Sequence, residues 1–148
     1  MQDILTCAMG LDVHRDIIVA CLVKGAVDAE PEAETRTFST LIPEMQKLRD
    51  WVIESECRNI AMESTGIYWQ PIYEMLESCF DGEISILVVN ARHMKNVPGR
   101  KTDMKDAQWI ATLLRAGLLK GSFIPDKAFR ELRHLTRYRK SVVHDITA

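Results

Sequence analysis

The order of apolar segments constrains the fold of this 148-residue chain most strongly. Residues 4–13 and 17–23 are dense in apolar side chains and have the length of buried strands. Residues 34–39 are more polar and are typical of a strand at a sheet edge. Because short links join these three segments, the sequence predicts an antiparallel meander.

Helical and strand patterns alternate in the next part of the chain. Residues 43–56 and 68–80 repeat apolar side chains at helical spacing, and residues 59–62 and 84–89 are predicted strands. A further helix is expected at about residues 103–116. This alternation predicts parallel strands joined by right-handed crossovers. The fold class is therefore α/β, with a mixed five-stranded sheet flanked by helices.

The start of that last helix, KTDMKDAQWIATLL, carries two carboxylates one turn apart, Asp103 and Asp106. Both fall on the face that should pack against the core, which also holds Ala107, Ile110 and Leu114. Carboxylates aimed inward repel each other and are costly to desolvate unless a cation lies between them. The pattern indicates a metal site, but helix capping by Asp103 with Asp106 in the first turn also explains it.

Two more acids lie on predicted strands. Asp12 stands between Leu11 and Val13, so it points to the opposite face of the sheet. Glu63 ends the strand that is predicted to begin at residue 59. Ligand sites of open sheets gather at strand ends near the switch in strand order. Carboxylate oxygens suit Mg²⁺, and paired ions roughly 4 Å apart promote phosphodiester chemistry. Asp12, Glu63, Asp103 and Asp106 are the predicted metal-binding and catalytic residues.

Charge is divided unevenly along the chain. Residues 1–90 hold 6 Lys and Arg against 16 Asp and Glu, whereas residues 91–148 hold 13 against 5. The basic second part indicates a nucleic-acid surface, although a basic helical face could simply offset the acidic part. A long connection before the Asp103 helix should contact phosphates. Its predicted contact residues, with the first turn of the helix, are Arg92, Lys95, Arg100, Lys101 and Lys105.

A final helix is predicted from Asp126 to the chain end. It carries a heptad-like apolar seam made of Leu132, Leu135, Val142 and Ile146, with Arg130, Arg133, Arg137 and Lys140 decorating it. We expect residues 1–122 to form the globular domain. Residues 123–148 are expected to begin a helical segment that leads to a further domain in a longer protein.

Other features exclude several protein classes. The four cysteines lack metal-binding spacing and indicate buried free thiols in a reducing cytoplasm rather than a zinc site. No apolar run has the length of a membrane span, and no signal peptide is evident, so no membrane association is expected. The sequence also lacks a Walker phosphate loop and the glycine-rich loop that a sugar kinase or actin-like ATPase needs after Asp12.

Three residues near the predicted acids have two possible roles. His14, beside Asp12, could act on a scissile phosphate, although a histidine in a turn is often only a polar surface residue. Tyr68 and Trp69 follow a Thr-Gly turn and could stack on a base or a sugar. Packing at a helix start is the alternative, and it suits Trp69 better.

Three motifs together resemble a known family. GLDVHRD with Asp12, MESTGIYW with Glu63 and KTDMKDA with Asp103 and Asp106 are similar to the DEDD signature of the insertion sequence 110 transposases, relatives of the pilin-gene invertases. The resemblance covers about residues 8–140. It implies a ribonuclease-H-like, RuvC-like catalytic domain that binds Mg²⁺, or Mn²⁺ in its place, through these four acids and acts on DNA during transposition.

The resemblance also implies what this chain lacks. Family members carry a C-terminal domain with a serine proposed to attack DNA, and they use a guide RNA to choose targets. The resemblance therefore implies part of a recombinase, with DNA and a guide RNA as partners and a homo-oligomer formed through the C-terminal helix. The alternative is a non-catalytic nucleic-acid-binding and oligomerisation module, for which we expect salt-sensitive binding with no metal requirement.

Overall fold

The computed structural model describes residues 4–79, 83–90, 94, 106–121 and 127–147. Its five strands form one sheet in the order β3-β2-β1-β4-β5. These strands are β1 (Cys7–Val13), β2 (Ile17–Lys24), β3 (Glu32–Ser39), β4 (Asn59–Ser64) and β5 (Ser85–Val89). The first three pair in antiparallel fashion, whereas β4 pairs parallel to β1 and β5 parallel to β4. The predicted meander and the predicted mixed sheet are both confirmed.

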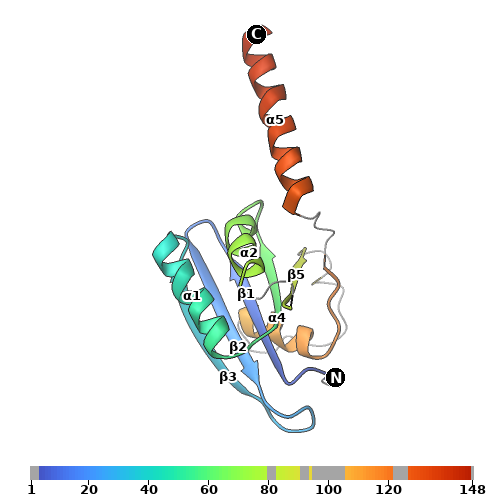
Figure 1. Ribbon diagram of the computed structural model, residues 1–148. Helices are drawn as coiled ribbons and strands as arrows, with labels where there is room; N and C mark the ends of the chain where they lie inside the picture. The colour runs from blue at the N-terminus through green and yellow to red at the C-terminus, as the bar shows by residue number, and fades with distance from the viewer. Residues whose placement is uncertain (1–3, 80–82, 91–93, 95–105, 122–126, 148) are drawn as a thin grey trace.

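Helices cover both faces of the sheet. Helices α1 (Ile42–Glu54) and α2 (Trp69–Glu77) lie on one face, and α4 (Asp106–Arg115) lies on the other (Figure 1). The long helix α5 (Lys127–Thr147) extends away from these layers (Figure 1). No helix in the part of the chain that the structure describes is long and apolar enough to cross a membrane.

The pleat of β1 divides its residues between two cores. Leu11 and Val13 belong to the larger core, under α1 and α2. Ala8 points the other way and packs with Ala61 of β4 and two residues of α4, Ile110 and Leu114. Because side chains alternate along a strand, Asp12 lies on the α4 face, as the sequence predicts.

Gly10 brings α4 unusually close to β1. A β-carbon at Gly10 would lie 2.1 Å from the carbonyl oxygen of Ala107 and 2.6 Å from the amide nitrogen of Ala111. Only a residue without a side chain fits under this turn of the helix. The contact fixes the height of the first turns of α4 above the sheet.

The other end of α4 is fastened by Arg115. Its carbonyl oxygen accepts hydrogen bonds from the amides of Ile4 and Leu5, at 2.7 and 3.1 Å, just before β1. Its buried guanidinium donates to the carbonyl oxygens of Leu5, Gly25 and Ala26 at 2.8–2.9 Å. The C-terminus of α4 therefore lies where β1 begins, so α4 runs antiparallel to β1 and its N-terminus points toward the strand's end.

Helix α5 meets the rest of the fold through Arg130. This residue is buried, donates to the Glu77 carboxylate at 2.8 Å and places its guanidinium 5.3 Å from the centre of the Tyr73 ring. The prediction that Arg130 decorates the apolar seam is therefore wrong, because its ion pair with Glu77 of α2 buries the side chain against the rest of the fold. The seam residues Leu132, Leu135, Val142 and Ile146 are exposed.

Element ends differ from the sequence predictions in several places. Strand β4 continues one residue past its predicted end, through Ser64, so Glu63 lies inside it. Strand β1 begins later than predicted, at Cys7, and α2 is shorter than predicted at both ends. The predicted Asp126 helix start and the domain boundary at residue 122 lie outside the described residues. All four cysteines are free, and Cys21 and Cys57 are buried as predicted.

Candidate metal centre

Asp12 and Glu63 lie next to each other on neighbouring parallel strands. The register pairs Asp12 with Glu63, two residues after the pair formed by Gly10 and Ala61. Both acids therefore point to the α4 face, from strands whose backbones run about 4.8 Å apart. The Asp12 side chain is only 18% exposed. The fold brings together two acids that are far apart in the sequence.

Asp106 lies at the end of α4 that points toward this edge of the sheet. It is the first residue of α4, directly before Ala107, whose carbonyl oxygen lies over Gly10. Asp12 follows Gly10 by two residues on the same face, toward the end to which the helix N-terminus points. Two of the four predicted acids thus lie at one edge of the sheet, and the helix that carries a third, Asp106, points its N-terminus toward that edge. Asp106 itself is exposed to solvent.

The remaining predicted residues fall on parts of the chain that the structure does not describe. They are Asp103, Arg92, Lys95, Arg100, Lys101 and Lys105. Among the side chains that are described, no group of three or more His, Cys, Asp or Glu is arranged to hold a metal ion. The metal-binding role of the four acids and the phosphate-binding role of the basic residues therefore stay predictions.

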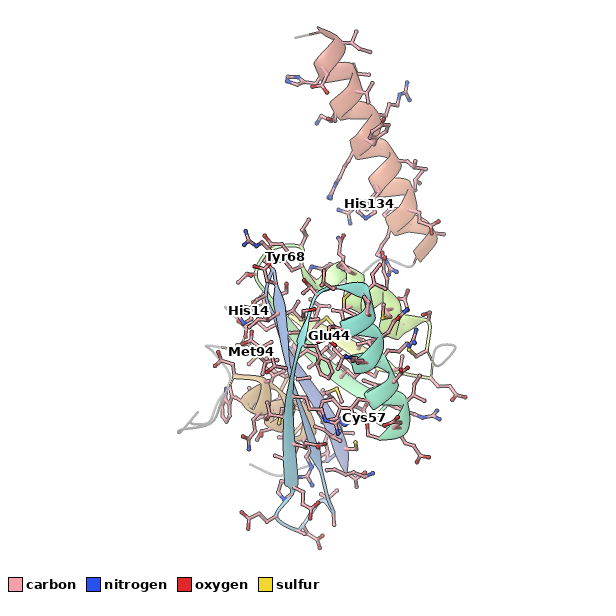
Figure 2. The ribbon with its side chains drawn as sticks, turned by 90° about the vertical axis from the view of Figure 1, so that its left-hand side faces the viewer. His14, Glu44, Cys57, Tyr68, Met94 and His134 are labelled. Carbon is pink, nitrogen blue, oxygen red and sulfur yellow. The ribbon has the colours of Figure 1, made fainter. Side chains whose placement is uncertain are left out.

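His14 is in direct contact with Asp12. Its Nε2 lies 3.1 Å from Oδ2 of Asp12, and its backbone amide donates to the carbonyl oxygen of Ile17 at 2.9 Å in the turn between β1 and β2. Figure 2 shows His14 and Tyr68 toward the end of the sheet that is nearer α5, with Cys57 toward the opposite end of the sheet. A donor on one carboxylate oxygen fixes the rotation of the Asp12 side chain, which leaves Oδ1 for another ligand.

The chemistry of this edge suits a hard divalent cation. Two adjacent carboxylates repel each other, and a cation between them removes that repulsion. The paired acids offer oxygen donors, which suit Mg²⁺ and Mn²⁺, whereas zinc and copper sites in proteins are built mainly from nitrogen and sulfur donors. Because Asp12 and Glu63 are only partly buried, the edge stays open to a substrate.

Arg15 is a residue near this edge that the sequence reasoning did not single out. Its carbonyl oxygen accepts a hydrogen bond from the Thr40 hydroxyl at 2.9 Å, which ties the β1–β2 turn to the segment before α1. The sequence feature that could have identified Arg15 is its place in the motif GLDVHRD, three residues after Asp12. A turn residue three positions after a predicted ligand lies at the same sheet edge.

Comparisons with known proteins agree with this arrangement. A family model described as a transposase, the DEDD transposases of insertion sequence 110, matches residues 9–148. The structure of Thermus thermophilus RuvC is similar at a TM-score of 0.50 and 12% identity, over 78% of this chain and 99% of that one. No curated protein matches the chain. The likeness shows a RuvC-like fold, which confirms the predicted fold class.

Two complexes are similar at lower scores. Thermus thermophilus RuvC with a Holliday junction substrate has a TM-score of 0.47 and 11% identity, over 77% of this chain and 94% of that one. A fowlpox virus resolvase with its substrate Holliday junction DNA has a TM-score of 0.47 and 8% identity, over 64% and 65%.

Proposed function

The chain belongs to the DEDD transposase family of insertion sequence 110, and on this premise we propose that it is the metal-dependent catalytic domain that acts on DNA phosphodiesters. The observation that supports this most is the pairing of Asp12 with Glu63 on adjacent parallel strands, with the start of α4 above them. A domain that only binds DNA has no need for two carboxylates at one strand-end edge.

The proposed metal ligands are positioned by different parts of the fold. Asp12 and Glu63 are held by the backbone pairing of β1 and β4, and Asp106 is positioned by the packing of α4 on Gly10. Asp103 is the proposed fourth ligand. Mg²⁺ or Mn²⁺ bound there supplies charge that activates an attacking oxygen and stabilises the leaving one. His14 holds one oxygen of Asp12 so that the carboxylate keeps its orientation.

Basic and apolar residues on α5 supply the proposed partner contacts. The side chains of Arg133, Arg137, Arg139 and Lys140 are exposed and can bind DNA phosphates. The exposed seam has the apolar spacing of a helix that pairs with a second copy of itself. We therefore propose that the domain works on DNA as a homo-oligomer joined through α5.

Metal titration tests the proposed site. We expect saturable binding of Mn²⁺ or Mg²⁺ by calorimetry, weakened at least about tenfold in an Asp12→Asn/Glu63→Gln variant because two charged ligands are lost. A matched control, Glu54→Gln/Glu131→Gln, removes two acids elsewhere, on α1 and α5. Equal affinity in all three proteins, with and without DNA, would contradict the proposal.

Non-catalytic binding is the second candidate function, and the exposed basic residues of α5 favour it. In that case DNA affinity falls steeply as the salt concentration rises, because binding releases counterions. Adding metal or replacing Asp12 then leaves the DNA affinity unchanged. The same titration, repeated with DNA present, therefore separates the two functions.

His14 gives a prediction about the metal dependence. We expect His14→Ala to raise the metal concentration needed for half-maximal activity about 10-fold, because losing a partner of a metal ligand usually costs 10–100-fold in affinity or activity. His14→Gln retains a donor of similar reach and should restore most of the affinity. A loss of thermal stability with unchanged metal dependence would show that His14 only supports the turn.

A further inference from the structure

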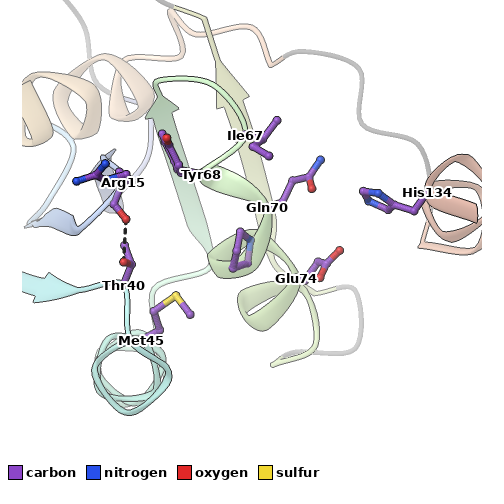
Figure 3. A pocket seen from close by; sticks show the side chains of 9 residues that line it. Arg15, Thr40, Met45, Ile67, Tyr68, Gln70, Glu74 and His134 are labelled. Carbon is purple, nitrogen blue, oxygen red and sulfur yellow. Dashed lines mark hydrogen bonds between the residues drawn. The ribbon is translucent and has the colours of Figure 1, made fainter. Parts of the chain in front are cut away.

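A cavity of about 510 Å³ opens beside the candidate metal centre. Its walls include Arg15 from the turn after Asp12, and Ile67 and Tyr68 from the turn after Glu63. Figure 3 shows these residues with Gln70 on one side and His134, from α5, on the other. The cavity therefore shares the strand-end edge with Asp12 and Glu63 but lies on the side of α1 and α2.

Two apolar side chains in the cavity wall, Ile67 and Tyr68, are exposed to solvent and do not belong to the core. Ile67 is 70% exposed and Tyr68 is 40% exposed, directly after Gly66, whose φ of 67° allows the tight turn. The next residue, Trp69, instead packs edge-on against Tyr73 with ring centres 5.4 Å apart. The predicted packing role thus holds for Trp69, whereas the Tyr68 ring is free to stack on a ligand.

The polar groups of the cavity suit a nucleotide. The Arg15 guanidinium donates to the Asp16 carboxylate at 3.0–3.3 Å, but both side chains are exposed, and such surface pairs are weak enough for a phosphate to compete. Gln70, Glu74 and His134 also line the cavity. The amide and the imidazole can hydrogen-bond a base or sugar, whereas the Glu74 carboxylate can accept only from a base or sugar donor and would repel a phosphate beside it. A volume of this size lies in the range of about 300–1,000 Å³ of small-molecule sites.

We propose that this cavity holds one unpaired nucleotide of the bound DNA, with its base stacked on Tyr68 and its phosphate on Arg15. The inference rests on the proposed function, since the neighbouring phosphodiester would lie at Asp12 and Glu63. A base inside an intact duplex cannot reach an aromatic ring in a cavity, so the domain should favour DNA that is already distorted or single-stranded. The cavity then selects the DNA shape on which the carboxylates act.

Binding to two matched DNAs tests this site. One is a fully paired duplex and the other carries a single extra unpaired nucleotide, both measured with the whole chain by fluorescence anisotropy without added metal. We expect tighter binding of the second DNA, and Tyr68→Ala to weaken only that binding, about tenfold. Tyr68→Phe should retain the preference, as should Tyr138→Ala, which removes an exposed aromatic ring from α5.

A crosslink supplies a readout that does not depend on the folding of a variant. With 5-iododeoxyuridine at the unpaired position, we expect irradiation to link the wild-type chain to the DNA through the peptide that contains Tyr68. A crosslink elsewhere, or equal affinity for both DNAs, overturns the cavity proposal and leaves the proposed function intact. If the chain binds neither DNA, both proposals fail.

Discussion

Replacing Glu63 by glutamine should abolish metal-dependent DNA cleavage or strand transfer, lowering the rate at least about 10³-fold, because the metal's contribution of several kcal/mol is lost. Glutamine keeps the size of the side chain and an oxygen, but it removes the negative charge and one metal-binding oxygen. Glu63 lies inside β4, where register with β1 is set by backbone pairing, so the fold should remain. Activity of a complete transposase that contains this domain is the measurement.

Two controls make the result specific to the metal site. Asp12→Asn should cause a similar loss, because Asp12 is the register partner of Glu63, although it also alters the contact with His14. Glu54→Gln, at the exposed last residue of α1, should leave the rate unchanged. Thermal unfolding of each variant shows whether the fold persists. A Glu63→Gln protein that is folded and fully active would refute the catalytic role of this edge.

Strand geometry explains why the positions of Asp12 and Glu63 in the fold could be predicted from the sequence. Alternation along β1 places Asp12 opposite Leu11 and Val13, and this holds for any strand whatever surrounds it. The crossover order from α1 onward places β4 parallel to a neighbouring strand, which brings Glu63 to the same edge. Local pattern and connection rules are therefore sufficient to gather the first two acids.

Tertiary contacts account for what the sequence did not predict. Helical spacing placed Arg130 among the basic residues that decorate the apolar seam, but its contacts with the Glu77 carboxylate and the Tyr73 ring bury it. The cavity beside Arg15 and Tyr68 is lined by two turns about 50 residues apart, together with residues of α1, α2 and α5, and no local pattern records their proximity. Strand β4 outlasts its apolar run because pairing with β1 extends it to Ser64.

Gly10 links the stability of the domain to the geometry of its site. It is the small residue that lets α4 sit low on the sheet, and Asp106 begins that helix one residue before the contact at Ala107. Because Arg115 fastens the far end of α4, anything that lifts the contact at Gly10 should tilt the helix and move its N-terminus. Asp106 would then withdraw from Asp12 and Glu63.

We expect Gly10→Ala to lower the free energy of unfolding by about 3 kcal/mol, the upper part of the usual range for overpacking. The added methyl group would lie 2.1 and 2.6 Å from backbone atoms of α4, which cannot rotate away as a flexible side chain can. Urea denaturation measures the change. The metal affinity of the folded fraction, measured by titration, should also fall, since one proposed ligand is displaced.

Gly121→Ala is the matched control for this substitution. Its β-carbon would meet the end of the Leu87 side chain at 3.0 Å, a contact that a small rotation relieves, so we expect a change below about 1 kcal/mol. If Gly10→Ala were no more destabilising than this control, the close contact with α4 would not determine the height of the helix. If it were destabilising but bound metal as tightly as the wild type, Asp106 would not be a ligand, and Asp12 and Glu63 would hold the ion without it.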